Sequence, residues 1–148
     1  FIYLDRINDP GNLGTIIRTA AWFGITQILL SPNSSDPFQP KTVRASAGLI
    51  SHMQIYENFQ TRILEMLKQK QGYRLIGATA HANQTLNTYK FESSQKYGFI
   101  FGSEAHGISK QISQLLDEQV NIPSSGIGES LNLAASTAIF LNIYRNQV

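Results

Sequence analysis

The sequence predicts an α/β domain in which a mostly parallel sheet is flanked by helices. Short apolar runs alternate with stretches of helical period, which is the pattern of strands that alternate with helices. No internal repeat, low-complexity stretch or long linker interrupts this alternation. A length of 148 residues with 42% hydrophobic residues is enough for one domain with a sizeable core.

The first half of the chain is expected to contain two strands and three helices. In chain order the elements are strand 1–4, turn 8–11, helix 12–23, strand 27–30, loop 34–40, helix 41–47 and helix 59–71. Asn12 stands where the N-cap of the first helix would be. Gly24 and Gly72 follow helical stretches as stops, because glycine readily takes the left-handed conformation of many helix ends.

The second half is expected to contain three more strands and two more helices. In chain order these are strand 74–80, strand 97–101, helix 109–118, strand 120–122 and helix 130–145. The last helix is apolar on nearly every side, whereas a helix on the surface of a monomer has a polar face. We therefore expect it to be buried in the core or in a subunit interface.

Composition excludes several classes of protein. Without cysteine the chain has no disulfide, zinc-finger, iron–sulfur or thiol chemistry, and its three scattered histidines do not predict a metal site. No segment approaches the ~20 apolar residues of a membrane span. The chain starts at Phe1 and shows no signal-peptide pattern, so we expect a piece of a longer cytoplasmic protein.

The charge balance is close to neutral. The formal net charge is +2, and no basic run of the kind that dominates phosphate-driven binding is present. A nucleic-acid partner is compatible with this balance. If there is one, we expect its main electrostatic anchor to lie outside this domain.

Residues 9–18 form the first of three segments with more small and polar residues than folding requires. Gly14 allows a ligand or another backbone to approach the first helical turn. Arg18 follows Asn12 by six residues, roughly one and two-thirds helical turns. A capped helix with an exposed arginine is the purely structural alternative.

The second segment is the glycine-bounded turn 102–107, directly after an apolar strand. Ligands of α/β sheets bind beyond the carboxyl ends of strands, so this turn lies where a site is expected. Glu104 either accepts hydrogen bonds from a ligand or faces the N-terminus of the helix that begins near Ser109. His106 is expected to be a solvated residue of the turn.

The third segment, residues 122–132, leads from the last strand into the last helix. Ser130 is placed to be a plain N-cap. Asn132 is a polar side chain in the first turn of an otherwise apolar helix, and a buried amide needs hydrogen-bond partners. None of the three segments matches GxGxxG, GxxxxGK[ST] or a GxSxG elbow.

Together the three segments resemble the three motifs of the SpoU/TrmH family of RNA ribose 2′-O-methyltransferases, within the trefoil-knotted superfamily. The motifs match, in order, at Asn12-x-Gly14-x-x-x-Arg18, at Phe101-Gly102-Ser103-Glu104 through Gly107, and at Ile122-Pro123 with Ser130-Leu131-Asn132. The resemblance covers almost the whole chain, which is read as one catalytic domain, 1–148, without the N-terminal RNA-binding domain that family members often carry. Ala105-His106 departs from the family, which often has glycine after the motif 2 glutamate.

The resemblance implies S-adenosylmethionine as methyl donor and a C-terminal trefoil knot whose loops hold it. Backbone groups at Gly102, Ile122 and Leu131 are expected to bind this cofactor, with Ala78 and Thr79 near its adenine. The family also implies a homodimer, which would bury the apolar last helix, and a structured RNA substrate, either tRNA or rRNA. No metal and no membrane partner are implied.

The same resemblance assigns Arg18 to the reaction. A guanidinium keeps its proton far above neutral pH, so we interpret Arg18 as a clamp on the adjacent phosphate that stabilises the developing alkoxide, and not as a general base. Asn12, Glu104, Ser130 and Asn132 would orient Arg18, the ribose and the cofactor. The alternatives are a non-catalytic RNA-binding or assembly module and a knotted methyltransferase that acts on a base.

Overall fold

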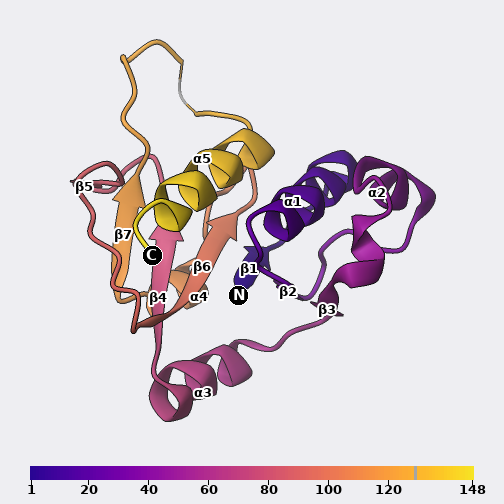
Figure 1. Cartoon of the computed structure of the whole chain (residues 1–148), viewed down its shortest axis with the longest axis horizontal. Coiled ribbons are helices and arrows are strands. Elements are labelled where there is room, and N and C mark those ends of the chain that lie inside the picture. Colours follow the sequence, from indigo (N-terminus) through magenta and orange to yellow (C-terminus); the bar gives the residue numbers. More distant parts are fainter. Residues whose placement is uncertain (129) are drawn as a thin grey trace.

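A computed structural model describes residues 1–128 and 130–148 and contains one sheet of seven strands. The strands are β1 (Ile2–Asp5), β2 (Gln27–Leu30), β3 (Gln54–Tyr56), β4 (Tyr73–Ala78), β5 (Gln84–Thr85), β6 (Lys96–Gly102) and β7 (Glu118–Asn121). Their order is β3-β2-β1-β6-β4-β7-β5, and every neighbouring pair is parallel (Figure 1). The predicted α/β class is confirmed, and the C-terminal knot stays a prediction.

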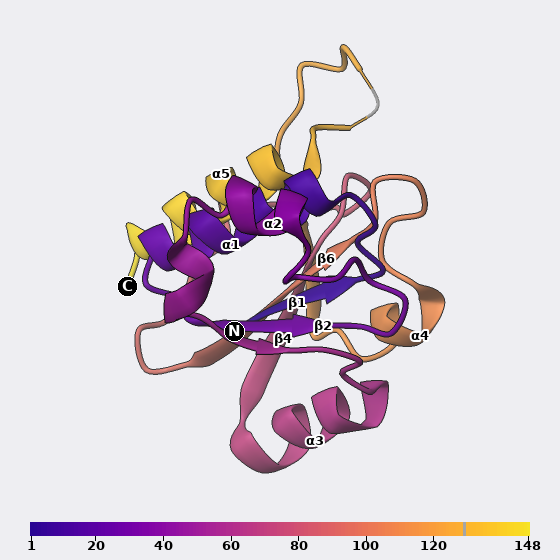
Figure 2. The ribbon, with the colours of Figure 1, turned by 90° about the vertical axis from the view of Figure 1, so that its right-hand side faces the viewer.

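Helices cover both faces of the sheet. They are α1 (Pro10–Trp22), α2 (Pro40–Ala45), the 3-10 helix η1 (Leu49–His52), α3 (Thr61–Gln71), α4 (Lys110–Ser113) and α5 (Leu133–Arg145). Figure 2 shows α1, α2 and α5 on one face of the sheet and α3 and α4 on the other. None of the helices in the described part of the chain has the length and apolar character that crossing a membrane requires.

The core lies in two layers, one on each face of the sheet, because successive side chains of a strand point to opposite faces. On β1, Ile2 and Leu4 belong to the cluster that includes α1 and α5, whereas Tyr3 belongs to the cluster that includes Leu64 of α3. Each such burial contributes roughly 1.5–3 kcal/mol to folding. Both faces of the central strands are therefore apolar, as the sequence predicts for a sheet covered on two sides.

Helix α1 begins earlier than predicted, and Asn12 is not its N-cap. Asp9 has the extended cap conformation, and its Oδ1 accepts the backbone N–H of Asn12 at 2.7 Å. Pro10 is the first helical residue, a position that suits its fixed φ and missing N–H. Gly24, with φ of 76°, ends the helix as predicted.

Helix α5 begins three residues later than predicted, and its N-cap is Asn132 in place of Ser130. Its inner face is buried through Leu133, Ala134, Thr137, Phe140 and Leu141. Its outer face, in contrast, exposes Ala135 and Ile139 in the isolated chain. The inner face is therefore buried in the core, as predicted, and the predicted subunit interface on the outer face stays a prediction.

Four other elements have bounds that differ from the prediction, and two strands were not predicted. Helix α4 has only four residues and ends at Ser113, and β7 begins at Glu118. The predicted strand 120–122 is therefore two residues too late, strand 74–80 ends at Ala78, and helix 41–47 covers 40–45. Strands β3 and β5 are absent from the prediction; they lie at the two edges of the sheet, where few side chains are buried and no strong apolar pattern is required.

Candidate functional site

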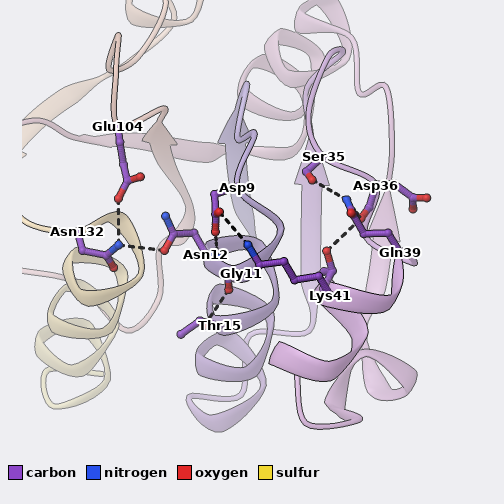
Figure 3. Close-up of polar contacts among 11 residues, drawn as sticks. Asp9, Gly11, Asn12, Thr15, Ser35, Asp36, Gln39, Lys41, Glu104 and Asn132 are labelled. Atoms are coloured by element: carbon purple, nitrogen blue, oxygen red, sulfur yellow. Dashed lines mark hydrogen bonds and ion pairs between the residues drawn. The ribbon is translucent and has the colours of Figure 1, made fainter.

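Asn132 joins the three sequence motifs at the carboxyl edge of the sheet (Figure 3). Its Nδ2 donates to Asn12 Oδ1 at 3.0 Å and to Glu104 Oε1 at 3.0 Å. Asn12 comes from the first turn of α1, Glu104 from the turn after β6, and Asn132 from the start of α5. We call these three residues the junction.

The amide of Asn132 has a fixed orientation, because every polar atom of its side chain has a partner. Its Oδ1 accepts the backbone N–H groups of Ala134 and Ala135 at 3.0 and 3.2 Å, which caps α5. Both hydrogens of Nδ2 are then directed at the acceptors on Asn12 and Glu104. The structure thus supplies the hydrogen-bond partners, although Asn132 is exposed and not buried as the sequence reasoning assumed.

Glu104 faces the N-terminus of a helix, but the helix is α5 and not the one near Ser109. Its Oε1 accepts the backbone N–H of Leu133 at 3.1 Å in addition to the Asn132 amide. A carboxylate at this end of a helix is stabilised by the helix dipole. Within the described part of the chain, Oε2 of Glu104 has no hydrogen-bond partner, so it remains able to accept a donor from a ligand.

A cavity of about 250 Å³ lies beside the junction. Its walls come from the segment after β1, from the turn after β6 and from the start of α5; they are Ile7, Asn8, Asp9, Asn12, Ser103, Glu104, Ala105, His106 and Leu133. Two of the three junction residues thus line a space next to the strand ends. Such a position is where ligands of open α/β sheets bind.

The turn after β6 requires glycine at Gly102 because the chain folds back onto this residue. A Cβ placed on Gly102 would lie 2.0 Å from the carbonyl carbon of Gly107 and 2.2 Å from the nitrogen of Ile108. The N–H of Gly107 donates to the carbonyl of Ser103 at 2.8 Å and closes the turn. The close approach fixes the turn from which Glu104 projects.

Arg18 and Ser130, which were predicted to act with the junction, lie apart from it. Arg18 is exposed on α1, and six residues correspond to about 9 Å along a helix axis, so it stands well beyond Asn12. It does not line the cavity beside the junction. Ser130 is exposed in the segment before α5, and no side-chain hydrogen bond of Ser130 is found among the described residues.

The residues expected to bind a cofactor lie mostly at one edge of the sheet. Strands β6, β4 and β7 are neighbours, so Gly102, Ala78 and Ile122 are at or just beyond three adjacent strand ends. Thr79 donates its N–H to the carbonyl of Val120 at 3.0 Å, which ties the end of β4 to β7. Leu131 is 52% exposed.

Asn121, the last residue of β7, is a candidate that the sequence reasoning missed. Its Nδ2 donates to the carbonyl of Ala82, while its Oδ1 is buried and has no partner among the described residues. A buried acceptor without a partner is costly unless a ligand or water supplies a donor. A polar residue at the end of a buried strand was the available sequence signal.

The electrostatics at the start of α1 are dominated by a cap and an ion pair. The N–H of Asn12, together with the Lys41 ammonium 3.4 Å from Oδ2, lowers the pKa of Asp9 from its usual value. Asp9 is therefore negative at neutral pH at the mouth of the cavity. In the part of the chain that the structure describes, no group of three acidic or histidine residues has the arrangement of a metal site.

In sequence, the chain is similar to known RNA methyltransferases. An uncharacterised tRNA/rRNA methyltransferase of Synechocystis is 39% identical over 99% of the chain and 53% of its own length. The 23S rRNA guanosine 2′-O-methyltransferase RlmP of Bacillus subtilis is 29% identical over 95% of the chain and 55% of its own length. The chain thus spans about half the length of these relatives.

The fold is also that of solved methyltransferase structures. The crystal structure of an AdoMet-bound rRNA methyltransferase from Sinorhizobium meliloti superimposes with a TM-score of 0.91 at 32% identity, covering 98% of this chain and 55% of that one. The model of the SpoU rRNA Methylase family matches residues 1–142. With its three motifs joined at one edge of a parallel sheet, the chain belongs to the SpoU rRNA methylase family.

Proposed function

We propose that this chain is the catalytic domain of an enzyme that transfers a methyl group from S-adenosylmethionine to a ribose 2′-hydroxyl of tRNA or rRNA. The single observation that carries the proposal is the junction, in which Asn132 holds Asn12 and Glu104 at the wall of a cavity. The relatives' names, tRNA/rRNA methyltransferase and 2′-O-methyltransferase, give the reaction class. We place the activity in the cytoplasm.

The cofactor site of the proposal lies at the ends of β4, β6 and β7. The buried Oδ1 of Asn121 fits a ligand that carries N–H or O–H donors, and S-adenosylmethionine carries both on its adenosine. Ala78 and Thr79 would lie near the adenine, and backbone groups at Gly102, Ile122 and Leu131 would hold the rest. When bound, the cofactor supplies an electrophilic methyl group on a positively charged sulfur.

The residues of this chain would position the ribose and assist loss of its proton. The 2′-hydroxyl must approach the methyl group in line, so it needs a fixed acceptor. Glu104, whose Oε2 is free among the described residues, and Asn12 stand at the cavity wall for this task. Ser130 would join them when the cofactor is present.

Arg18 would act from outside this cavity. Its guanidinium stays charged at any physiological pH and is exposed on α1, so it is suited to hold the phosphate next to the target ribose. A positive charge there stabilises the oxyanion that develops at the 2′-oxygen.

A homodimer is part of the proposal. The isolated chain exposes Trp22 at 82%, Leu131 at 52% and Ile139 at 37%. Ile139 lies on the outer face of α5, and Arg18 and Trp22 lie four residues apart on one face of α1. A second copy that covers α5 would bury apolar surface on this side of the molecule. Sedimentation should show a dimer, and Ile139→Glu should weaken it.

The main anchor for RNA is proposed to lie in a separate domain. This chain has a net charge of only +2 and no basic run, which is little for a protein that binds RNA through its phosphates alone. We expect the chain by itself to bind S-adenosylmethionine and to bind RNA weakly. Tight and site-specific RNA binding by this chain would contradict that division.

Calorimetric titration with S-adenosylmethionine tests the proposal. The wild-type chain should bind saturably, and Leu131→Arg should abolish binding while circular dichroism shows an unchanged fold. Phe38→Arg is the matched control, because Phe38 is 61% exposed and lies between β2 and α2, away from the three strand ends. Absence of binding to folded wild-type protein would instead favour a non-catalytic RNA-binding module.

A further inference from the structure

A second and larger cavity, of about 430 Å³, lies beside the ends of β1 and β2, next to α3 and α4. Its polar lining includes Arg6, Arg62, Ser31, Gln60 and Ser109. None of the residues with a proposed catalytic or cofactor role lines it. Two arginines from separate elements, Arg6 and Arg62, line this cavity, and guanidinium groups are well suited to bind an anionic ligand.

Arg6 is held in this position at a conformational cost. It is one of the few residues other than glycine with positive φ, 57°, and its side chain is 39% exposed. Its backbone N–H donates to Ser31 Oγ at 2.7 Å, which ties the turn after β1 to the end of β2. Strained residues that the surrounding structure fixes in this way are concentrated at functional sites.

Asp5 orients the guanidinium of Arg6 without cancelling the charge of the cavity. The carboxylate is buried; its Oδ2 accepts the N–H of Ser109 at 2.6 Å, and its Oδ1 lies 3.4 Å from Arg6 Nε. Nε itself is buried and forms no hydrogen bond among the described residues. With Arg62 added, the charged groups of the lining leave one net positive charge.

The start of α3 adds donors to the same wall. Gln60, Thr61 and Arg62 all line the cavity, and the cap residue Gln60 makes no side-chain bond to the first turn. The N-terminal N–H groups and the dipole of an 11-residue helix favour an anion, in addition to the two arginines. Tyr3, whose pKa burial raises to about 12, remains a neutral hydroxyl there.

Consecutive residues of one short stretch of chain line the two cavities. Asp5 and Arg6 line the larger cavity, and the next three residues, 7–9, line the cavity beside the junction. A polynucleotide whose ribose occupies the smaller cavity therefore has the larger one within reach of a neighbouring phosphate.

We propose that the larger cavity, through Arg6 and Arg62, binds a backbone phosphate of the RNA strand on one side of the target ribose. This inference rests on the proposed function for its ligand. It adds a contact that positions the strand, in a domain that binds RNA weakly. The chemistry recognised is a phosphate group, and the test below separates an RNA phosphodiester from free phosphate.

The test follows the amide NMR signals of Thr61, Arg62 and Ser109 in the intact chain. A short oligouridylate, added at low salt, should shift them, and inorganic phosphate should compete only at much higher concentration. Arg62→Gln should remove most of this response and should reduce the salt dependence of oligouridylate binding by about 0.7 in log–log slope, the contribution of one single-strand phosphate contact. Arg6→Asn, which tolerates the positive φ, should have the same effect.

Arg145→Gln is the matched control, because Arg145 is exposed at the far end of α5, about 18 Å along the helix axis from Leu133. It should leave the response intact. An unchanged response in Arg62→Gln, or shifts produced by inorganic phosphate but not by oligouridylate, would overturn the inference. Titration of the wild type and the same variants with S-adenosylmethionine keeps the two proposals apart. If the wild type does not bind S-adenosylmethionine, only the methyltransferase proposal is contradicted.

Discussion

The five residues predicted to carry the reaction fall into two groups that the structure treats differently. Asn12, Glu104 and Asn132 are joined by hydrogen bonds and help to begin α5. Arg18 and Ser130 are exposed and stand apart from them. The difference separates two roles: the joined group caps α5 and also lines the cavity proposed for the ribose, whereas the exposed group has no role in the fold and is available to contact a substrate. Substitutions in the joined group should therefore affect stability as well as activity, whereas substitutions in the exposed group should affect activity alone.

The largest effect is expected from Arg18→Ala, and on activity alone. Loss of a charge that stabilises the developing oxyanion should lower the rate of methyl transfer about 10²–10³-fold. The free energy of unfolding should change by less than about 0.5 kcal/mol, because the side chain is exposed. Incorporation of labelled methyl groups into unmodified tRNA and rRNA transcripts, together with urea unfolding, measures both. A variant that keeps its rate would remove Arg18 from the reaction.

Asn132→Ala should show the opposite behaviour and destabilise the fold. The substitution removes the N-cap of α5 and the bridge between Asn12 and Glu104, for an expected loss of about 2 kcal/mol in the free energy of unfolding. Ser130→Ala is the control from the same segment, with an expected change under about 0.5 kcal/mol. Equal losses in the two variants, measured by urea unfolding, would mean that the capping assignment is wrong.

Glu104→Gln should have a smaller effect than Asn132→Ala. The amide keeps an acceptor but loses the negative charge at the start of α5, which is expected to lower the free energy of unfolding by about 1 kcal/mol. A double-mutant cycle with Asn132→Ala should give a coupling energy well above zero, because the two side chains are in contact. Strictly additive effects of the two substitutions would show that Glu104 and Asn132 contribute independently to stability.

The smallest effect concerns the pH dependence at Asp9. The pKa of Asp9 is lower in the folded chain than in the unfolded chain, so its carboxylate stabilises the fold above about pH 4 and this contribution is lost as the pH falls through the folded pKa. Asp9→Asn keeps a capping side chain but does not titrate. The difference between the urea midpoints of wild type and variant should therefore shrink from about pH 6 to about pH 3. A constant difference would show that the cap does not depend on charge.

Much of the junction could be predicted because its residues lie in motifs whose order and context were visible in the sequence. The predicted starts of α1 and α5 were wrong for a common reason: near each start, two residues are able to act as N-cap. Pro10, which suits the first helical position, was a sequence signal in favour of Asp9. For α5 the choice between Ser130 and Asn132 depends on Glu104, which is 28 residues away from Asn132 and invisible to local propensity.

The exposed edge strands and the larger cavity could not be predicted from the sequence, for physical reasons. Strand β5 has two residues, and it is specified by pairing with β7 more than by its own pattern. That Arg6 and Arg62 line one cavity depends on the sheet order, which brings the turn after β1 near the start of α3. Neither residue stands in a recognisable motif.

The junction joins residues far apart in the sequence, which has a consequence for how the chain folds. Asn12 and Asn132 are 120 residues apart, and β1 must also pair with β6, where Ile2 lies opposite Phe99. Contacts of such large sequence separation slow folding, since the loop between them must close first. During synthesis the first two-thirds of the chain can form β1, α1 and β2, but the junction must wait for α5. The junction, and the proposed methyl transfer that depends on it, should therefore form late in folding, after the central strands have paired.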